Sequence, residues 1–211
     1  MKFDLLLYAV TDRSWEGPLT LEEQLEEALR AGVTLVQLRE KELDEAGFLK
    51  RARRIKDITD KYRVPLIIND NIAVALGCDA AGVHVGQGDQ CPRTVRRLIG
   101  PDKILGVTAK TVEQARLAQE QGADYLGSGA VFGSQTKKDA RPMTAEMLKD
   151  ITAAVSIPVV AIGGINLDNI HLLAGTGVAG AAVVSGIFGA ADVGQTVAAL
   201  RQQAGIITGK T

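Results

Sequence analysis

The 211-residue sequence has few aromatic residues and almost no net charge. Phe, Trp and Tyr make up 4% of the chain, whereas apolar residues together reach 46%. The core is therefore expected to be aliphatic, which suits parallel strands that are buried on both faces. Because 24 basic residues stand against 25 acidic ones, no strong field points to nucleic acid or to a membrane surface as a partner.

The sequence also lacks long apolar runs and a cysteine framework. No run approaches the roughly 20 apolar residues that a membrane span needs. The segment that begins Met1–Asp4 lacks the long apolar region and cleavage site of a signal peptide. Cys78 and Cys91 have no metal-binding spacing and are expected to be free thiols. These features predict a cytoplasmic protein.

Eight short β-branched or aliphatic runs alternate with longer stretches of helical periodicity. The runs are Leu5–Val10, Thr34–Leu38, Leu66–Ile68, Gly82–Val85, Ile104–Val107, Tyr125–Leu126, Val159–Ile162 and Ala181–Val184. The repeated order of strand and helix favours a parallel sheet. Eight units favour a closed ring, so residues 1–211 are predicted to form one single-domain (β/α)8 TIM barrel, an α/β fold.

Capping signals mark the stretches between the runs as helices. Thr20–Glu23 has the pattern of a capping box, and Gly32 follows the last apolar position of that helix. Further helices are expected from Asp44 to Tyr62, from Thr111 to Gly122, from Thr144 to before Pro158, and from Val193 to Ala204. Two shorter helices are expected after Asn71 and Cys91.

Polar residues gather where the second, third and fourth runs end, and barrel active sites lie at the carboxyl ends of strands. Gln37, Arg39 and Lys41 share one face by strand alternation, and two cations suit a phosphate-bearing ligand. Asp70 and Asp89 follow neighbouring runs and could share Mg²⁺, which binds carboxylates together with phosphate oxygens. Solvated strand ends and simple turns are the alternatives for these residues.

Glycine-rich segments follow the last three runs. Residues 127–138 contain small residues, hydroxyls and two lysines, enough to wrap a phosphate. Gly163–Ile165 and Ser185–Ile187 follow the seventh and eighth runs, where barrels often bind a phosphate through backbone N–H groups. Two separate anion sites, one of them with a metal, suggest a phosphate ester that meets a diphosphate. His84 is expected to be structural, and His171, which falls inside a predicted helix, is given no role.

Together these segments resemble the thiamine-phosphate synthase family over nearly the whole chain. The resemblance rests on six segments in order: Gln37–Lys41, Asn69–Asp70, His84–Asp89, Val131–Lys137, Ile162–Ile165 and Ser185–Ile187. It implies a transferase that joins an aminomethylpyrimidine diphosphate to a thiazole phosphate and releases pyrophosphate, with Mg²⁺ as cofactor. The implied partners are these small molecules alone.

The resemblance also implies a role for individual residues. The pyrimidine diphosphate would contact Gln37, Leu38, Arg39, Glu40, Lys41, Asn69, Thr108 and Lys137. Among these, the implied catalytic residues are Arg39, Lys41 and Lys137. The implied Mg²⁺ ligands are Asp70 and Asp89. The thiazole phosphate would contact Ser134, Gln135, Thr136, Gly164, Val184 and Ser185.

Two departures from the family pattern concern polar groups near the ligands. Thr108 stands where a serine is usual, and Ser134 stands where a threonine is usual. The segment Gly129–Ser134 also lacks two prolines that the family loop often has, which should loosen the loop. Both substitutions keep a hydroxyl group, so these departures are expected to affect rate and affinity rather than the reaction.

Three alternatives remain. A thiazole tautomerase shares the barrel but binds only the thiazole phosphate. It would not need the cations and carboxylates, and it is expected to carry a catalytic histidine in the mouth of the barrel. A Schiff-base aldolase needs a lysine within a strand, which no run contains, and a sugar-phosphate isomerase needs only one phosphate site. A non-catalytic ligand-binding barrel would tolerate loss of Asp70 or Asp89, which this chain retains. The oligomeric state and the presence of a carboxylate on the thiazole stay open.

Overall fold

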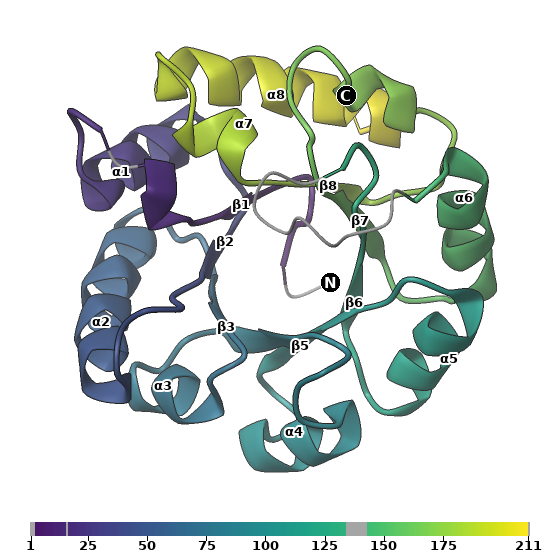
Figure 1. Cartoon of the computed structure of the whole chain (residues 1–211), viewed down its shortest axis with the longest axis horizontal. Coiled ribbons are helices and arrows are strands. Elements are labelled where there is room, and N and C mark those ends of the chain that lie inside the picture. The colour runs from purple at the N-terminus through teal and green to yellow at the C-terminus, as the bar shows by residue number, and fades with distance from the viewer. Residues whose placement is uncertain (1–2, 16, 134–142, 211) are drawn as a thin grey trace.

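A computed structural model describes residues 3–15, 17–133 and 143–210. Eight parallel strands close into a barrel in chain order, and the last strand pairs with the first. They are β1 (Leu7–Val10), β2 (Leu35–Leu38), β3 (Leu66–Asn69), β4 (Gly82–Val85), β5 (Ile104–Thr108), β6 (Tyr125–Gly129), β7 (Val159–Ile162) and β8 (Gly180–Val183). The predicted (β/α)8 barrel is confirmed, with the strands as an inner ring and the helices around it (Figure 1).

The helices begin and end close to their predicted capping signals. They are α1 (Leu21–Ala31), α2 (Glu45–Lys61), α3 (Ile72–Gly77), α4 (Pro92–Ile99), α5 (Val112–Glu120), α6 (Ala145–Ala154), α7 (Ser185–Phe188) and α8 (Val193–Thr208). Two 3₁₀ turns, η1 (Arg13–Trp15) and η2 (Ile170–Leu173), complete the described elements. The capping box at Thr20 and Glu23 is present, and Gly32 closes α1 in a left-handed conformation.

Most strand boundaries agree with the sequence prediction within two residues, and three elements differ more. β6 continues past Leu126 to Gly129, because pairing with β5 and β7 on either side holds residues of low strand propensity in the sheet. The helix expected around His171 is a single 3₁₀ turn. α8 continues to Thr208 and ends at Gly209, whose left-handed backbone forms its cap.

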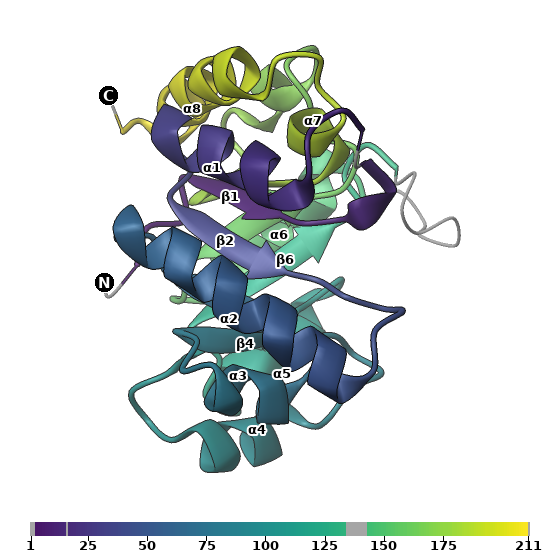
Figure 2. The ribbon, with the colours of Figure 1, turned by 90° about the vertical axis from the view of Figure 1, so that its left-hand side faces the viewer.

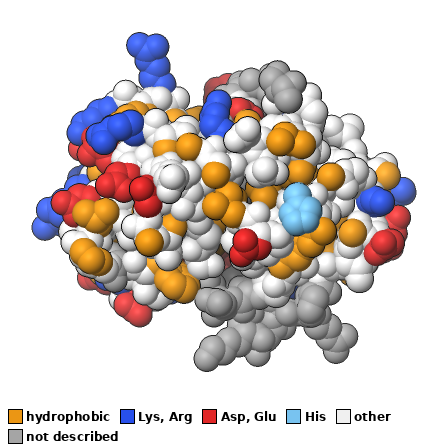
Figure 3. Space-filling view, turned by 90° about the horizontal axis from the view of Figure 1, so that it is seen from above, with side chains coloured by type: hydrophobic (Ala, Val, Ile, Leu, Met, Phe, Trp, Pro, Cys, Tyr) orange, Lys and Arg blue, Asp and Glu red, His pale blue; other side chains and the backbone are white. Residues whose placement is uncertain are grey.

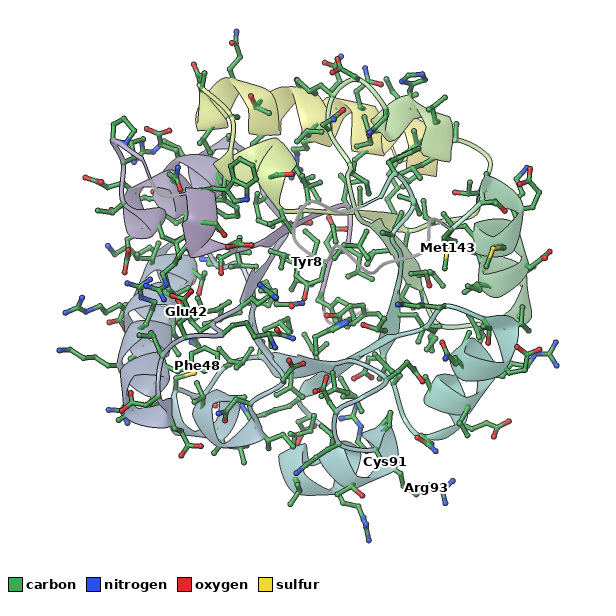
Figure 4. All side chains as sticks on the ribbon, viewed as in Figure 1. Tyr8, Glu42, Phe48, Cys91, Arg93 and Met143 are labelled. Carbon is green, nitrogen blue, oxygen red and sulfur yellow. The ribbon has the colours of Figure 1, made fainter. Side chains whose placement is uncertain are left out.

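The buried side chains form two layers, as strand alternation requires. The larger layer lies between the strands and the surrounding helices, and Figure 2 shows α1 and α2 side by side on the outside of the barrel. The smaller layer fills the barrel itself with aliphatic side chains and two tyrosines, Tyr8 and Tyr125. These rings meet edge to face with centroids 5.9 Å apart, and Phe3 packs against Tyr125. Tyr8 lies inside the ring of strands (Figure 4).

Cys78 is buried, Cys91 is exposed, and both are free thiols. On the face seen in Figure 3, charged side chains of both signs are interspersed with apolar ones. Within the described ranges, no helix combines the length and the apolar character needed to cross a bilayer.

Candidate active site

One cavity opens at the carboxyl ends of the strands, and every strand of the barrel contributes to its lining. The floor consists of inward-facing strand residues, and the rim consists of the segments that follow the strands. Most of the residues predicted from the sequence surround this cavity: Gln37, Arg39, Lys41, Asn69, Asp70, Asp89, Thr108, Gly164, Val184 and Ser185. Barrel closure thus brings together residues that are far apart along the chain.

Six residues of the predicted site lie elsewhere or are not described. Leu38 is fully buried in the layer between strands and helices and does not line the cavity. The Glu40 side chain is 2% exposed and forms ion pairs with Arg13 at 3.0 Å and with Arg51 at 3.3 Å. The predictions for Ser134, Gln135, Thr136 and Lys137 fall outside the described residues.

The cationic side of the cavity is built where β1 and β2 end. The backbone N–H of Arg39 donates to the Thr11 hydroxyl at 3.1 Å, which ties the two strand ends together. The Arg39 guanidinium lies 3.9 Å from the Asp12 carboxylate. Because the guanidinium is only partly exposed and faces an acid at long range, it keeps donors for a ligand.

Asp70 carries the predicted metal site together with Asp89. Its carboxylate accepts hydrogen bonds from the Lys41 ammonium at 2.7 Å and from the Asn69 amide at 2.7 Å. Burial raises the pKa of the Asp70 carboxyl, Lys41 opposes this shift, and the neighbouring Asp89 carboxylate adds to it. The two acids are therefore close enough to repel each other, which a bound cation would relieve.

The chemistry of this pair fits a hard cation. No cluster of three or more His, Cys, Asp or Glu side chains suited to a metal occurs in the described part of the chain. Two carboxylates are nevertheless the usual protein share of a Mg²⁺ site, which substrate phosphate oxygens and water complete. The Asp89 carboxylate also accepts the Gly86 N–H at 2.7 Å, which holds it at the end of β4.

The opposite side of the cavity is lined by backbone groups rather than by charged side chains. Gly163 and Gly164 follow β7 with φ values of 105° and 67°, a region that favours glycine. A Cβ on Gly164 would lie 2.5 Å from the Phe132 carbonyl oxygen, so no side chain fits there. Val184 and Ser185 begin α7 next to this segment. The arrangement suits close approach of a phosphate to backbone N–H groups.

A chain of hydrogen bonds forms the polar part of the floor. Gln37 donates its amide N–H to the Tyr8 hydroxyl at 2.6 Å, and Tyr8 meets the Tyr125 hydroxyl at 2.8 Å. The Tyr125 hydroxyl lies 3.0 Å from Nδ1 of His84, whose Nε2 lies 3.0 Å from the Thr108 hydroxyl. His84 is thus hydrogen-bonded at both nitrogens, as expected for a structural histidine, and it also lines the cavity.

Sequence reasoning missed several lining residues. Tyr8 lies in β1 two residues before Val10 on the same face, and this spacing points its side chain into the barrel. Asp12 and Lys110 also line the cavity. Lys110 stands two residues after Thr108, the same spacing that pointed to Arg39 after Gln37, so this signal was available.

Comparison with known proteins adds a family match. The family model described as thiamine monophosphate synthase matches residues 7–187. A thiamine-phosphate synthase of Clostridium tetani is 52% identical over 190 residues, which cover 90% of this chain and 91% of the relative. One of Ruminiclostridium cellulolyticum is 53% identical over 192 residues, covering 91% of each chain.

A solved structure shares the whole fold. The thiamine phosphate pyrophosphorylase of Pyrococcus furiosus superposes with a TM-score of 0.88 at 36% identity. The match covers 98% of this chain and 97% of that one.

Proposed function

Because this chain belongs to the thiamine monophosphate synthase family, we propose that its cavity joins a pyrimidine diphosphate to a thiazole phosphate. Its activity is that of a thiamine-phosphate synthase, a transferase of thiamine biosynthesis. The products are thiamine phosphate and pyrophosphate. The free thiols of Cys78 and Cys91 support a cytoplasmic setting for this reaction.

The observation that carries the proposal is the division of one cavity into two unlike anion sites. Arg39, Lys41, Asp70 and Asp89 line one side with charge. Gly164 and Ser185 line another part with backbone and a hydroxyl. A diphosphate that must leave needs charge to stabilise it, whereas a phosphate that stays with the product needs only to be held.

The proposed reaction requires stabilisation of the charge on the departing diphosphate and does not require a general base. The bond between the exocyclic methylene carbon and the diphosphate oxygen breaks, and the electron pair leaves with pyrophosphate. Donation from the aminopyrimidine stabilises the resulting cation, and the lone pair of the thiazole nitrogen forms the new C–N bond. Neither step transfers a proton, so a nucleophile–base pair is unnecessary.

The residues around the cavity match these needs. The Arg39 guanidinium offers a planar fork to phosphate oxygens, and the Lys41 ammonium offers a point charge. Asp70 and Asp89 are the residues that would hold Mg²⁺. When bound, the metal supplies Lewis-acid stabilisation of the departing diphosphate. The aliphatic floor around Val10, Val160 and Ile162 keeps water from the cationic carbon.

A thiazole tautomerase is the main alternative. Such an enzyme binds the thiazole phosphate alone and has no use for a diphosphate site. The Lys41–Asp70 ion pair at 2.7 Å and the nearby Asp89 favour the synthase instead, because they form charged equipment beside the thiazole-phosphate side of the same cavity.

The test is to follow pyrophosphate release with each substrate alone, with both, and with both plus Mg²⁺. Release is expected only when both substrates and the metal are present. Release without the thiazole phosphate would indicate hydrolysis, and no release from the complete mixture would refute the proposed function.

A further inference from the structure

The hydrogen-bond chain under the cavity has three central members that the reaction above does not use. Tyr8 and Tyr125 are almost completely buried within the otherwise aliphatic interior of the barrel, and His84 is buried beside them. The two ends of the chain, Gln37 and Thr108, are the residues expected to contact the pyrimidine. The chain therefore links two ligand-facing groups on β2 and β5 through residues of β1, β6 and β4.

Glycines on β5 and β6 leave space for this hydrogen-bond chain. A Cβ on Gly106 would lie 2.3 Å from the Tyr125 hydroxyl oxygen and 2.5 Å from Nδ1 of His84. A Cβ on Gly127 would lie 3.1 Å from Cε1 of His84. Glycine at position 106 thus leaves open the place where Tyr125 and His84 meet.

The direction of the hydrogen bonds follows from the number of protons available. Burial is the largest influence on both phenols and raises the pKa of Tyr8 and of Tyr125, so each keeps its proton and has one hydrogen to donate. Tyr8 accepts from the Gln37 amide and therefore donates to Tyr125. Tyr125 then donates to Nδ1 of His84, which leaves the histidine proton on Nε2, facing the Thr108 hydroxyl oxygen.

This direction fixes what each end offers to a ligand. Gln37 donates one amide hydrogen to Tyr8, which fixes the orientation of the amide group, and its carbonyl oxygen remains as an acceptor. The Thr108 oxygen accepts from His84, so its hydroxyl hydrogen remains as a donor. Both residues line the cavity.

We propose that Tyr8, Tyr125 and His84 are positioning residues that set this polarity and thereby select an aminopyrimidine over its 4-oxo analogue. The inference rests on the proposed function and extends it to substrate choice. An exocyclic amino group donates and a ring nitrogen accepts, which complements an acceptor at Gln37 and a donor at Thr108. A 4-oxo group presents an acceptor to the Gln37 oxygen, and the contact becomes repulsive.

Two variants interrupt the hydrogen-bond chain at different residues. Tyr125→Phe removes the donor to Nδ1 of His84, so the histidine proton is no longer held on Nε2. Tyr8→Phe removes the partner of Gln37 but leaves the Tyr125 hydroxyl beside His84. The matched control is Tyr62→Phe, because Tyr62 donates its hydroxyl to Glu26 at 3.1 Å outside the cavity.

The first readout is the His84 tautomer, measured by ¹⁵N NMR with the exposed His171 as internal reference. In the wild type and in Tyr8→Phe, the proton is expected on Nε2. In Tyr125→Phe, the Nδ1–H form should appear. A wild-type protein with the proton on Nδ1 would overturn the inference, and this measurement requires no turnover.

The second readout is kcat/KM for the aminopyrimidine diphosphate against its 4-oxo analogue. Tyr125→Phe and Tyr8→Phe should each reduce the wild-type preference for the amino over the 4-oxo substrate by about 10-fold or more, which corresponds to about 1.4 kcal/mol. The loss should fall on the KM for the pyrimidine and leave the KM for the thiazole phosphate unchanged. Tyr62→Phe should keep the wild-type ratio.

The two failures are distinguishable. A wild-type protein that releases no pyrophosphate from the aminopyrimidine substrate contradicts the proposed function. An unchanged ratio in active Tyr125→Phe and Tyr8→Phe variants contradicts the positioning role and leaves the synthase activity intact. If one variant does not fold, the other decides the second question.

Discussion

At the residue scale, Asp70 and Asp89 differ in how much negative charge they can offer to a cation at the proposed metal site. Lys41 already neutralises much of the Asp70 charge through a 2.7 Å ion pair, whereas the Asp89 carboxylate accepts a hydrogen bond from the neutral Gly86 N–H. Asp89 is therefore the carboxylate whose charge is most available to a cation.

Asp89→Asn should abolish most turnover while leaving the fold intact. The asparagine carbonyl oxygen can still accept the Gly86 N–H, so the loop keeps its anchor while the charge is lost. Losing one group aimed at the charge that develops in the transition state lowers kcat by about 10²- to 10³-fold. Steady-state pyrophosphate release measures the effect, and normal turnover would mean that the metal assignment is wrong.

The control for this variant is Asp79→Asn. Asp79 is exposed and pairs with Lys103 at 2.8 Å away from the cavity. Its positive φ of 50° is one that asparagine tolerates well. Activity of this control should match that of the wild type.

Glu40 and Glu42 offer a second comparison, because both bind the same arginine. Glu40 is 2% exposed and contacts Arg13 and Arg51, whereas Glu42 is 85% exposed and contacts Arg13. The burial of Glu40 beside two cations indicates a structural role at the end of β2, where it fixes the backbone between Arg39 and Lys41.

Glu40→Gln is expected to lower the free energy of unfolding by about 1–3 kcal/mol, because a buried charged hydrogen bond is weakened. Glu42→Gln should change it by less than about 1 kcal/mol, as for most exposed pairs. Urea unfolding of the two variants measures the difference. Equal effects would show that burial does not set the strength of these pairs.

At the element scale, β5 and β6 are unusual strands because glycines face the interior. Gly106 lies opposite Tyr125 in the β5–β6 register, and Gly127 lies opposite Thr108. Small residues here leave room for the rings of His84 and Tyr125, which fill the barrel in their place. The cost is strand propensity, which explains why the sequence indicated only Tyr125–Leu126 as the sixth strand.

Gly106→Ala should therefore destabilise the barrel although alanine favours strands no less than glycine does. The added methyl would lie 2.2 Å from Cζ of the buried Tyr125 ring, and overpacking of this kind costs about 1–3 kcal/mol. Thermal and urea unfolding measure the loss. The control is Gly194→Ala in α8, where the nearest atom lies at 3.6 Å and a gain of about 0.5 kcal/mol is expected.

At the scale of the whole molecule, the core that holds the barrel together is separate from the charged rim that would bind ligands. The buried layers are aliphatic, and each fully buried Leu, Ile or Val contributes about 1.5–3 kcal/mol. Lys41, Asp70 and Asp89 belong to neither layer. Stability and catalysis should therefore respond differently to removal of the metal.

Chelation by EDTA should stop pyrophosphate release without shifting the urea midpoint of the ligand-free protein. Addition of Mg²⁺ with the pyrimidine diphosphate should raise the free energy of unfolding by about 2.7 kcal/mol at a ligand concentration 100-fold above Kd. The comparison needs only unfolding curves with and without ligand. A midpoint that falls on chelation alone would instead identify the metal as part of the fold.

Much of the fold and part of the candidate site could be read along the chain. Strand alternation predicted that Gln37, Arg39 and Lys41 share a face, and all three line the cavity. The same local reasoning could not place Glu40, because its partners Arg13 and Arg51 come from η1 and α2. Asp12, by contrast, follows the end of β1 by two residues and lines the cavity, so the strand-end signal for it was present in the sequence.

The sequence by itself determined the order of strands and helices, the caps and the residues at each strand end, because these depend on neighbours within a few positions. Only the tertiary structure decided that Tyr8 meets Tyr125, which lies 117 residues away, and that His84 joins them to Thr108. The physical reason is closure of the barrel. Once the ring forms, inward side chains from all strands share one small volume. Their contacts then depend on how the side chains fit together and on which groups can donate a hydrogen, rather than on spacing along the chain.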